Sequence, residues 1–131
     1  MSKISYSAVV LDEESANTLK REYSSYIPDD WKWFGHHMTI KMGELSPDMK
    51  QYIGQEIDLV VDTIGQDERA IAAGIGAGGD LSKNEIPHIT LAVNINGGGK
   101  PFHSNKIPKE NWKPVGNRIR LTGHVTEIPQ Q

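Results

Sequence analysis

The sequence predicts one α/β domain of the α+β kind, with a mostly antiparallel sheet of about six strands and two helices. Three observations predict it. The 131 residues fit a single domain, which we take as residues 1–131. Segments with strand patterns outnumber helical ones. The chain has no cysteine, with 37% hydrophobic and 24% charged residues. A core held by packing rather than by disulfides or thiolate-bound zinc is therefore expected.

Six segments carry the strand signal, because they are short, rich in Val, Ile and Thr, and bounded by turn residues. The segment that precedes the second histidine motif is the weakest of the six, since three glycines interrupt it. A Gly-Gly-Gly run at 97–99 predicts a flexible loop. The predicted strands are 6–11, 36–42, 57–64, 70–77, 88–93 and 117–128.

Two segments carry helix signals. The first begins at the acidic residues 12–14, which suit the positive end of a helix dipole. Apolar residues then recur at helical spacing to about Tyr26, and Pro28 ends the pattern. The second is short and begins at Ser46-Pro47, a cap residue followed by proline at the first helical position.

Charge is distributed unevenly along the chain. The net charge is −3 overall, but residues 1–70 carry −6 and residues 100–120 carry +5. A local basic segment on an acidic protein suits a small anionic ligand better than a long nucleic acid, although a solvated loop explains it equally well. No apolar run or leader-like start directs the chain to a membrane or out of the cell, so we expect a cytoplasmic protein without a membrane partner.

A His-x-Thr triplet occurs three times, at 37–39, 88–90 and 124–126. On a strand, residues two apart point to the same face, so each triplet presents an imidazole beside a hydroxyl. We expect the first two to converge on one cavity, with His37 and Thr39 from one strand and His88 and Thr90 from the other. The third triplet is interpreted as a coincidence on the last strand.

This pair of motifs suits the cleavage of a phosphodiester. One neutral histidine would take a proton from water or a ribose hydroxyl, and the other, protonated, would give one to the leaving oxygen. The threonine hydroxyls would donate hydrogen bonds to the non-bridging phosphate oxygens. The scheme requires no metal and no cofactor. His36 should point to the opposite face from His37, and neighbours on a strand cannot converge on one metal ion.

The stretches Gly35-His36-His37-Met38-Thr39-Ile40 and Ile86-Pro87-His88-Ile89-Thr90-Leu91 resemble the motifs of the 2H phosphoesterase superfamily. The resemblance implies a compact bilobal fold whose two motifs face each other across a cleft. By residue match, His37 and His88 would be the acid–base pair, and Thr39 and Thr90 the phosphate-binding residues. The spacing of 51 residues between the motifs and the small chain imply a version trimmed relative to the family.

The resemblance implies a nucleotide phosphodiester as substrate and leaves two classes open. One is a 2′,3′-cyclic phosphate at an RNA end, as in RNA processing and tRNA-ligase domains. The other is a cyclic nucleotide or cyclic oligonucleotide signal, as cleaved by phage anti-CBASS enzymes. A function of another class is also open, in which the domain binds nucleotides or RNA ends without turnover.

Residues near the motifs and in the basic segment are candidates for contact with the substrate. The aromatic ones could stack on a base, and the alternative for each is packing in the core. His103 is expected to be exposed in a loop, and His124 to be structural. The candidate substrate-binding residues are Trp33, Phe34, Ser104, Asn105, Lys106 and Trp112.

Overall fold

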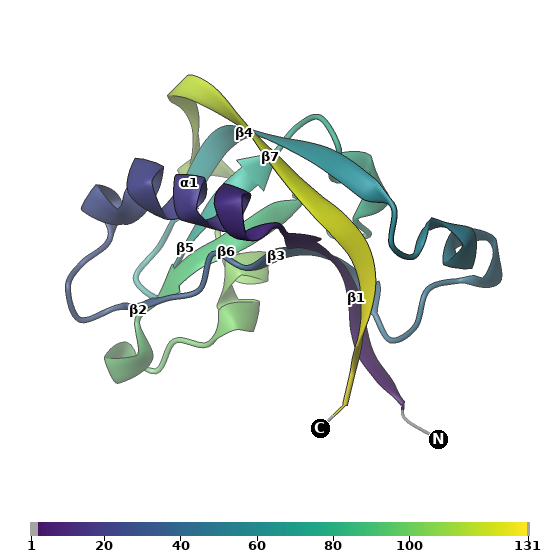
Figure 1. Cartoon of the computed structure of the whole chain (residues 1–131). Helices are drawn as coiled ribbons and strands as arrows, with labels where there is room; N and C mark the ends of the chain where they lie inside the picture. Colours follow the sequence, from purple (N-terminus) through teal and green to yellow (C-terminus); the bar gives the residue numbers. More distant parts are fainter. Residues whose placement is uncertain (1–2, 131) are drawn as a thin grey trace.

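Seven strands and one α-helix form the fold in our computed structural model, which describes residues 3–130 (Figure 1). The helix α1 (Glu13–Tyr23) follows the first strand directly, and short 3-10 helices occupy several connections. The strands are β1 (Ile4–Leu11), β2 (Lys32–Trp33), β3 (His37–Met42), β4 (Glu56–Gln66), β5 (Ala70–Ile75), β6 (His88–Val93) and β7 (Trp112–Pro129).

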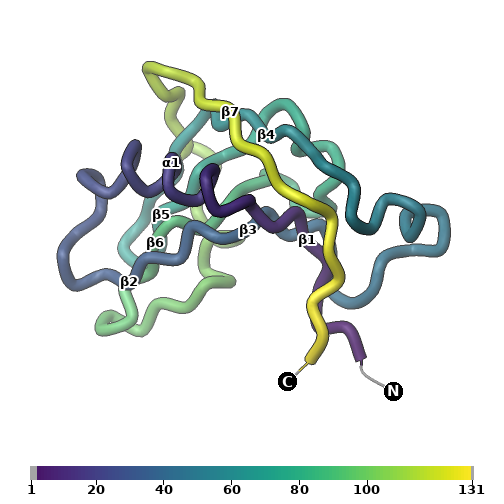
Figure 2. The backbone as a smooth tube through the Cα atoms, viewed as in Figure 1, coloured from purple at the N-terminus to yellow at the C-terminus, as the bar shows by residue number. Residues whose placement is uncertain are grey.

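Six of the strands close into a ring. Their order is β6-β3-β1-β7-β4-β5, and β5 pairs again with β6, while the short β2 extends from β6. Every pairing is antiparallel, which confirms the predicted type of sheet. Ile4 pairs with Pro129, so the first and last strands run side by side at one end of the barrel (Figure 2). Ring closure leaves none of these six strands as an open edge.

One hydrophobic cluster fills the ring and takes side chains from all six strands. Because side chains alternate along a strand, the neighbours of these core residues face away from the core. Leu19 and Tyr23 of α1 add to the cluster, which explains why the amphipathic segment after β1 folds back as a helix. The strand residues of the cluster are Val9, Leu11, Met38, Ile40, Leu59, Val61, Ile71, Ala73, Ile75, Ile89, Leu91, Leu121 and Val125.

The first predicted helix is shorter than expected, and the second forms a helix of the tighter 3-10 type. The first ends at Tyr23 and continues as a 3-10 turn, Ser24–Tyr26. The second is the 3-10 helix Pro47–Tyr52, which has Ser46 at its N-cap and Pro47 at its first position as predicted. An isolated α-helix as short as Pro47–Tyr52 gains too few hydrogen bonds to be stable, so the segment forms a 3-10 helix instead.

The strands depart from the prediction mainly at β7. It begins at Trp112 rather than 117, because Trp112, Lys113 and Pro114 pair with β4. These three residues show no alternation of apolar and polar side chains. This part of the strand packs against its local neighbours rather than into the main core. The two-residue β2 is too short to leave a pattern. Gly74 of β5 and Gly76 just after it lie against Thr63 and Asp62 of β4, where an added Cβ would stand 1.9 Å and 2.4 Å from side-chain oxygens.

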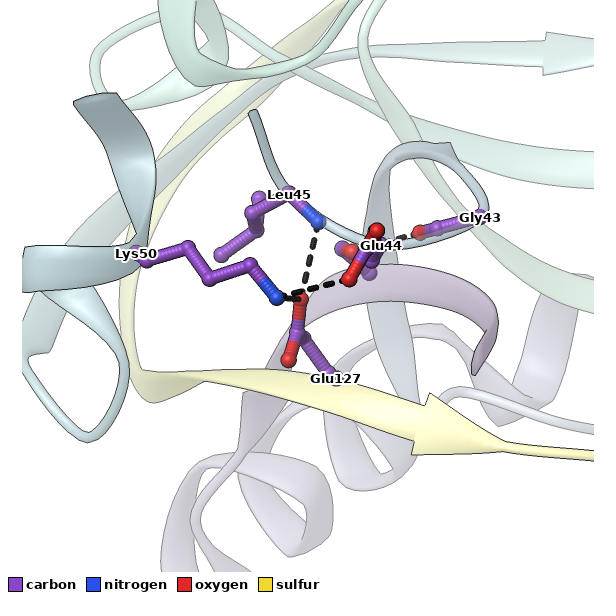
Figure 3. A network of polar contacts seen from close by, with 6 residues as sticks. Gly43, Glu44, Leu45, Lys50 and Glu127 are labelled. Atoms are coloured by element: carbon purple, nitrogen blue, oxygen red, sulfur yellow. Dashed lines mark hydrogen bonds and ion pairs between the residues drawn. The ribbon is translucent and has the colours of Figure 1, made fainter. Parts of the chain in front are cut away.

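A polar network ties the segment after β3 to β7 (Figure 3). The Leu45 N–H donates to Glu127 Oε2 at 2.9 Å, and Lys50 Nζ lies 3.2 Å from the same carboxylate. Lys50 also donates to Glu44 at 2.8 Å. The side chain of Leu45 is buried in the core. Together these contacts hold the 3-10 helix Pro47–Tyr52 against the far end of the barrel from α1.

Candidate active site

The two expected motif strands, β3 and β6, are neighbours, and one residue pair joins them. Met38 pairs with Ile89, and these are the middle residues of the two His-x-Thr triplets. In an antiparallel pair this register sets His37 toward Thr90 and Thr39 toward His88. Met38 and Ile89 are fully buried in the barrel, so the histidines and threonines lie on the outer face. The sequence therefore places two imidazoles and two hydroxyls in one small area.

A cavity of about 530 Å³ opens over this area. All four expected residues line it, so the predicted convergence of the two motifs is found. The volume is within the range of pockets that bind small molecules. Among the described residues that line it, none is Asp, Glu, Lys or Arg. Its lining is Tyr6, Phe34, His36, His37, Thr39, Met42, Asn84, His88, Thr90, Pro101, Phe102 and Asn105.

His37 opens β3 and is held from two sides. Its ring stacks on Tyr6 of β1 at 4.9 Å between centroids, and its Nδ1 lies 2.9 Å from Nδ1 of His36. Burial lowers the pKa of His37 to about 4, and repulsion from His36 and His88 adds to the effect. The imidazole is therefore neutral at pH 7, which is the state that accepts a proton.

His88 opens β6 and is buried, with 7% of its surface exposed. Its Nδ1–H donates to the Ile86 carbonyl at 2.7 Å, because a carbonyl oxygen only accepts. This bond fixes the tautomer and leaves Nε2 available to a ligand. Burial lowers the pKa of His88, while the bond to Ile86 opposes that change by favouring the charged ring. The two histidines are thus chemically different despite their similar motifs.

The threonines sit in different surroundings. Thr90 Oγ1 lies 2.8 Å from Ser104 Oγ, which belongs to the 3-10 helix Pro101–Lys106. Ser104 is 1% exposed, so this helix packs directly against the motif strand β6. The Thr39 carbonyl accepts a hydrogen bond from Ser82 Oγ at 2.8 Å, which ties β3 to the segment before β6.

The candidate substrate-binding residues divide into three groups. Phe34 and Asn105 line the main cavity. Ser104 and Trp112 line a smaller adjoining cavity of about 90 Å³, which shares His88, Asn84 and Asn105 with the larger one. Trp33 packs against the barrel core, and Lys106 is exposed and lines neither cavity. Of the basic segment, Lys109 reaches the smaller cavity, where it pairs with Glu85 at 2.5 Å.

His36 was expected to point away from His37, and that expectation is wrong. β3 begins only at His37, so strand alternation does not extend to His36. Gly35 has φ +53°, a conformation that glycine adopts readily, and the resulting bend brings His36 back over the cavity. The exposed His36 ring meets the ring of His37 edge to face at 82°.

Several lining residues were not foreseen. Tyr6, Met42, Asn84, Pro101 and Phe102 come from segments far apart in sequence and carry no shared motif. Tyr6 had one available signal, since it is an aromatic residue on a strand that neighbours the motif strand. Phe102 and Met42 are 53% and 73% exposed, so they form an apolar rim. Such a rim suits a flat, weakly polar group such as a base.

The other two histidines lie outside the cavity. His124 is on β7 and its Nδ1 lies 2.8 Å from Asp12 Oδ1, so the third triplet is part of a separate contact. His103 is buried rather than exposed as expected. Its Nδ1 accepts from the Lys100 N–H at 2.9 Å and caps the 3-10 helix Pro101–Lys106. A cap on an irregular helix cannot be recognised from a sequence pattern, so the burial of His103 was not predictable.

Metal clusters and membrane-spanning helices are both absent from the part of the chain that the structure describes. Within residues 3–130, no group of three or more His, Asp or Glu side chains is placed to share a metal ion. In the same part of the chain, none of the helices has the length and apolar character that crossing a membrane requires.

Comparisons with known proteins establish the fold. No protein-family model matches the sequence, and no curated protein matches it. Among solved structures, the chain is similar to the crystal structure of E. coli LigT in complex with NADP+, with a TM-score of 0.50 and 15% sequence identity. The similarity covers 100% of this chain and 96% of the LigT chain. The predicted fold class is therefore confirmed: the chain has a LigT-like fold, and its small size is consistent with a trimmed form of it.

Proposed function

We propose that this protein is a phosphodiesterase of the 2H type that hydrolyses a nucleotide phosphodiester by two-histidine acid–base catalysis, without a metal. The observation that carries the proposal is the register Met38–Ile89. It sets two His-x-Thr triplets head to tail around one cavity, so an imidazole stands on each side of a bound phosphate. The LigT-like fold supports the same class of activity.

His37 is proposed as the general base. Its ring is neutral because its pKa is lowered to about 4, and its Nδ1 is occupied by His36. In the proposed reaction, His37 Nε2 takes a proton from water or from a neighbouring ribose hydroxyl. The oxygen so activated forms a bond to phosphorus. A base with a low pKa is a weaker base, but it remains unprotonated through the whole neutral range.

His88 is proposed as the general acid. Its Nδ1–H is bound to the Ile86 carbonyl, which stabilises the positively charged ring, so its Nε2–H can serve as the donor. As the bond between phosphorus and the leaving oxygen breaks, His88 gives that oxygen a proton. Burial lowers the pKa of His88 in the empty site. The negative charge of a bound phosphodiester raises it again and so charges the ring when substrate arrives.

Thr39 and Thr90 are proposed to hold the phosphate. Ser104 lies 2.8 Å from the Thr90 hydroxyl, and by donating to it Ser104 leaves the proton of Thr90 free for a non-bridging oxygen. Such fixed donors stabilise charge on the phosphate oxygens in the transition state. No lysine or arginine is among the described residues that line the cavity, so this charge falls to the hydroxyls and to His88.

The substrate is proposed to be a nucleotide, and two classes remain in view. LigT has been crystallised with NADP+, a dinucleotide, and the cavity of about 530 Å³ with its apolar rim is large enough for a nucleoside. The first class is a 2′,3′-cyclic phosphate at an RNA end. The second is a cyclic nucleotide or cyclic oligonucleotide, whose cleavage would serve a phage against host defence.

A turnover screen in the presence of EDTA tests the reaction and separates the substrates. It compares 2′,3′-cyclic mononucleotides, RNA that ends in a cyclic phosphate, and cyclic di- and trinucleotides. We expect turnover of at least one class, with a bell-shaped dependence of kcat/KM on pH. Complete loss of activity on addition of EDTA contradicts the metal-free scheme. Tight binding of nucleotide with no product favours the alternative, a binding domain that sequesters nucleotides or RNA ends.

Three histidine variants test the assignment of the site. His37→Ala and His88→Ala should each lower kcat/KM by about 10²–10⁴-fold, because each removes a proton-transfer group. His124→Ala is the matched control, since His124 also belongs to a His-x-Thr triplet on a strand but lies outside the cavity. Its activity should stay within about two-fold of the wild type. Full activity in both His37→Ala and His88→Ala would contradict the assignment of these histidines as the proton-transfer groups.

A further inference from the structure

The side chain of His36 occupies an unusual place beside the proposed base. Its Nδ1 lies 2.9 Å from Nδ1 of His37, and this is the only side-chain hydrogen bond of His37 in the described part of the chain. The backbone of His36 is fixed as well, because its carbonyl accepts from the Leu11 N–H at 3.0 Å. The two rings meet edge to face at 82° rather than stacking, and the distance between the two nitrogens is that of a hydrogen bond.

Two nitrogens at this distance must share one proton. If both were bare they would repel, and if both carried protons they would clash, so one donates and the other accepts. When His37 donates from Nδ1, its Nε2 is bare and accepts a proton from the substrate side. When His36 donates instead, the neutral His37 carries its proton on Nε2 and has no free lone pair there. The direction of this bond therefore decides whether His37 is a base.

We propose that His36 is a positioning residue, which accepts a hydrogen bond from His37 Nδ1–H and thereby holds His37 in the tautomer whose Nε2 is free to act as the base. The inference rests on the proposed function, in which His37 is that base. It parallels the general arrangement in which a third group orients a catalytic imidazole. Here a neutral imidazole, rather than a carboxylate, does the orienting.

The surroundings of His37 leave this role to His36. Tyr6 from β1 covers the ring face, and His88 from β6 is the nearest further titratable group. Neither bonds to a ring nitrogen of His37 among the contacts of the described residues. No carboxylate lines the cavity within the same residues, and His36 is the side chain that bonds to a ring nitrogen of His37.

Substitutions at position 36 test the role. His36→Ala removes the acceptor and should lower kcat/KM about 10-fold or more, with KM little changed. In His36→Asn the amide oxygen stands where Nδ1 stood, so this variant should recover most of the activity. His36→Asp supplies a charged acceptor that stabilises the His37 imidazolium, so it should move the acidic limb of the pH–rate profile to higher pH. His124→Ala again serves as the control for loss of a histidine outside the cavity.

A second measurement tests the inference without relying on enzymatic turnover. Nitrogen-15 NMR of the wild type at pH 7 should show His37 protonated at Nδ1 and bare at Nε2, and this preference should be lost in His36→Ala. A proton on Nε2 of His37 in the wild type overturns the proposal. So does His36→Ala with undiminished kcat/KM, or His36→Asn as impaired as His36→Ala. If no substrate is turned over but the NMR result holds, the proposed function fails while the positioning of His37 stands.

Discussion

At the scale of the single residue, the protonation of His37 links the site to the stability of the fold. Its pKa is lowered to about 4 in the folded protein, whereas an unfolded chain titrates near 6.5. Between these values the unfolded state binds more protons than the folded state. Stability is therefore fully present above the unfolded value and is lost as the pH falls toward 4.

The size of this loss can be tested with a variant that cannot titrate. We expect acidification from pH 7 to 4.5 to cost the wild type about 2–3 kcal/mol more than His37→Asn, from the shift in pKa alone. Urea unfolding of both proteins at the two pH values measures the difference. Equal acid sensitivity of the wild type and His37→Asn would contradict the prediction.

Individual site residues were predictable where a motif repeats. His37, Thr39, His88 and Thr90 carry a pattern on strands, and the antiparallel register then brings the two copies together. His36 was misplaced because the conformation of one glycine, Gly35, which no pattern shows, makes the strand begin one residue late, at His37. The rim residues Met42 and Phe102 were missed for another reason. Met42 ends β3 with no motif of its own, and Phe102 reaches the cavity through the path of a connecting segment, which no local pattern records.

At the scale of the element, the start of β3 depends on Gly35. Its φ of +53° disfavours a side chain, and an added Cβ would stand 2.5 Å from the ring of Trp33. The same residue is bound to β6, since its N–H donates to the Thr90 carbonyl at 2.9 Å. Gly35 thus joins the bend that turns His36 inward to the strand that carries the second motif.

Gly35→Ala should therefore destabilise the protein by about 2–4 kcal/mol, because backbone strain and overpacking against Trp33 add together. Gly43→Ala is a matched control. Gly43 also has a positive φ, +80°, but an added Cβ there meets nothing within 4 Å. It should lose only about 1–2 kcal/mol, from strain alone. Urea denaturation measures both, and equal losses would show that packing on Trp33 contributes nothing.

The elements themselves were predictable to different degrees. Strands 57–64, 88–93 and 36–42 match β4, β6 and β3 closely, because each alternates between the barrel core and the outer face. The start of β7 and the irregular helices were not predictable, since their residues satisfy local hydrogen bonds without a repeating apolar face. The segment 101–106 illustrates this. It is held by Ser104 and by the cap at His103, and both contacts appear only after folding.

At the scale of the whole molecule, one main core and one closed ring predict that the fold unfolds as a single cooperative unit. Strand count and sheet type were predictable from the chain. Closure of the ring was not, because it depends on the pairing of β3 with β6, which are separated in the chain by β4 and β5. The β3–β6 pairing is also the shortest in the ring, a single residue pair, and the cavity lies over it.

Cooperativity predicts how the barrel responds to a lesion far from the site. Leu121 of β7 is fully buried and pairs with Leu59 of β4, on strands that do not carry the motifs. Leu121→Ala should cost about 2–5 kcal/mol through loss of buried surface and the cavity left behind. Because no strand can leave a closed ring without opening it, the whole barrel should unfold together.

Two probes report on different parts of the barrel. Tryptophan fluorescence follows Trp31 and Trp33, at and just before β2, and Trp112 at the start of β7, whereas far-UV circular dichroism follows the whole backbone. Both should show the same midpoint in urea for the wild type and a common lower midpoint for Leu121→Ala. Arg120→Ala, which changes the exposed neighbour of Leu121, should leave the midpoint nearly unchanged. Separate transitions for the two probes would mean that one part of the barrel unfolds apart from the rest, and the single-core description would then be wrong.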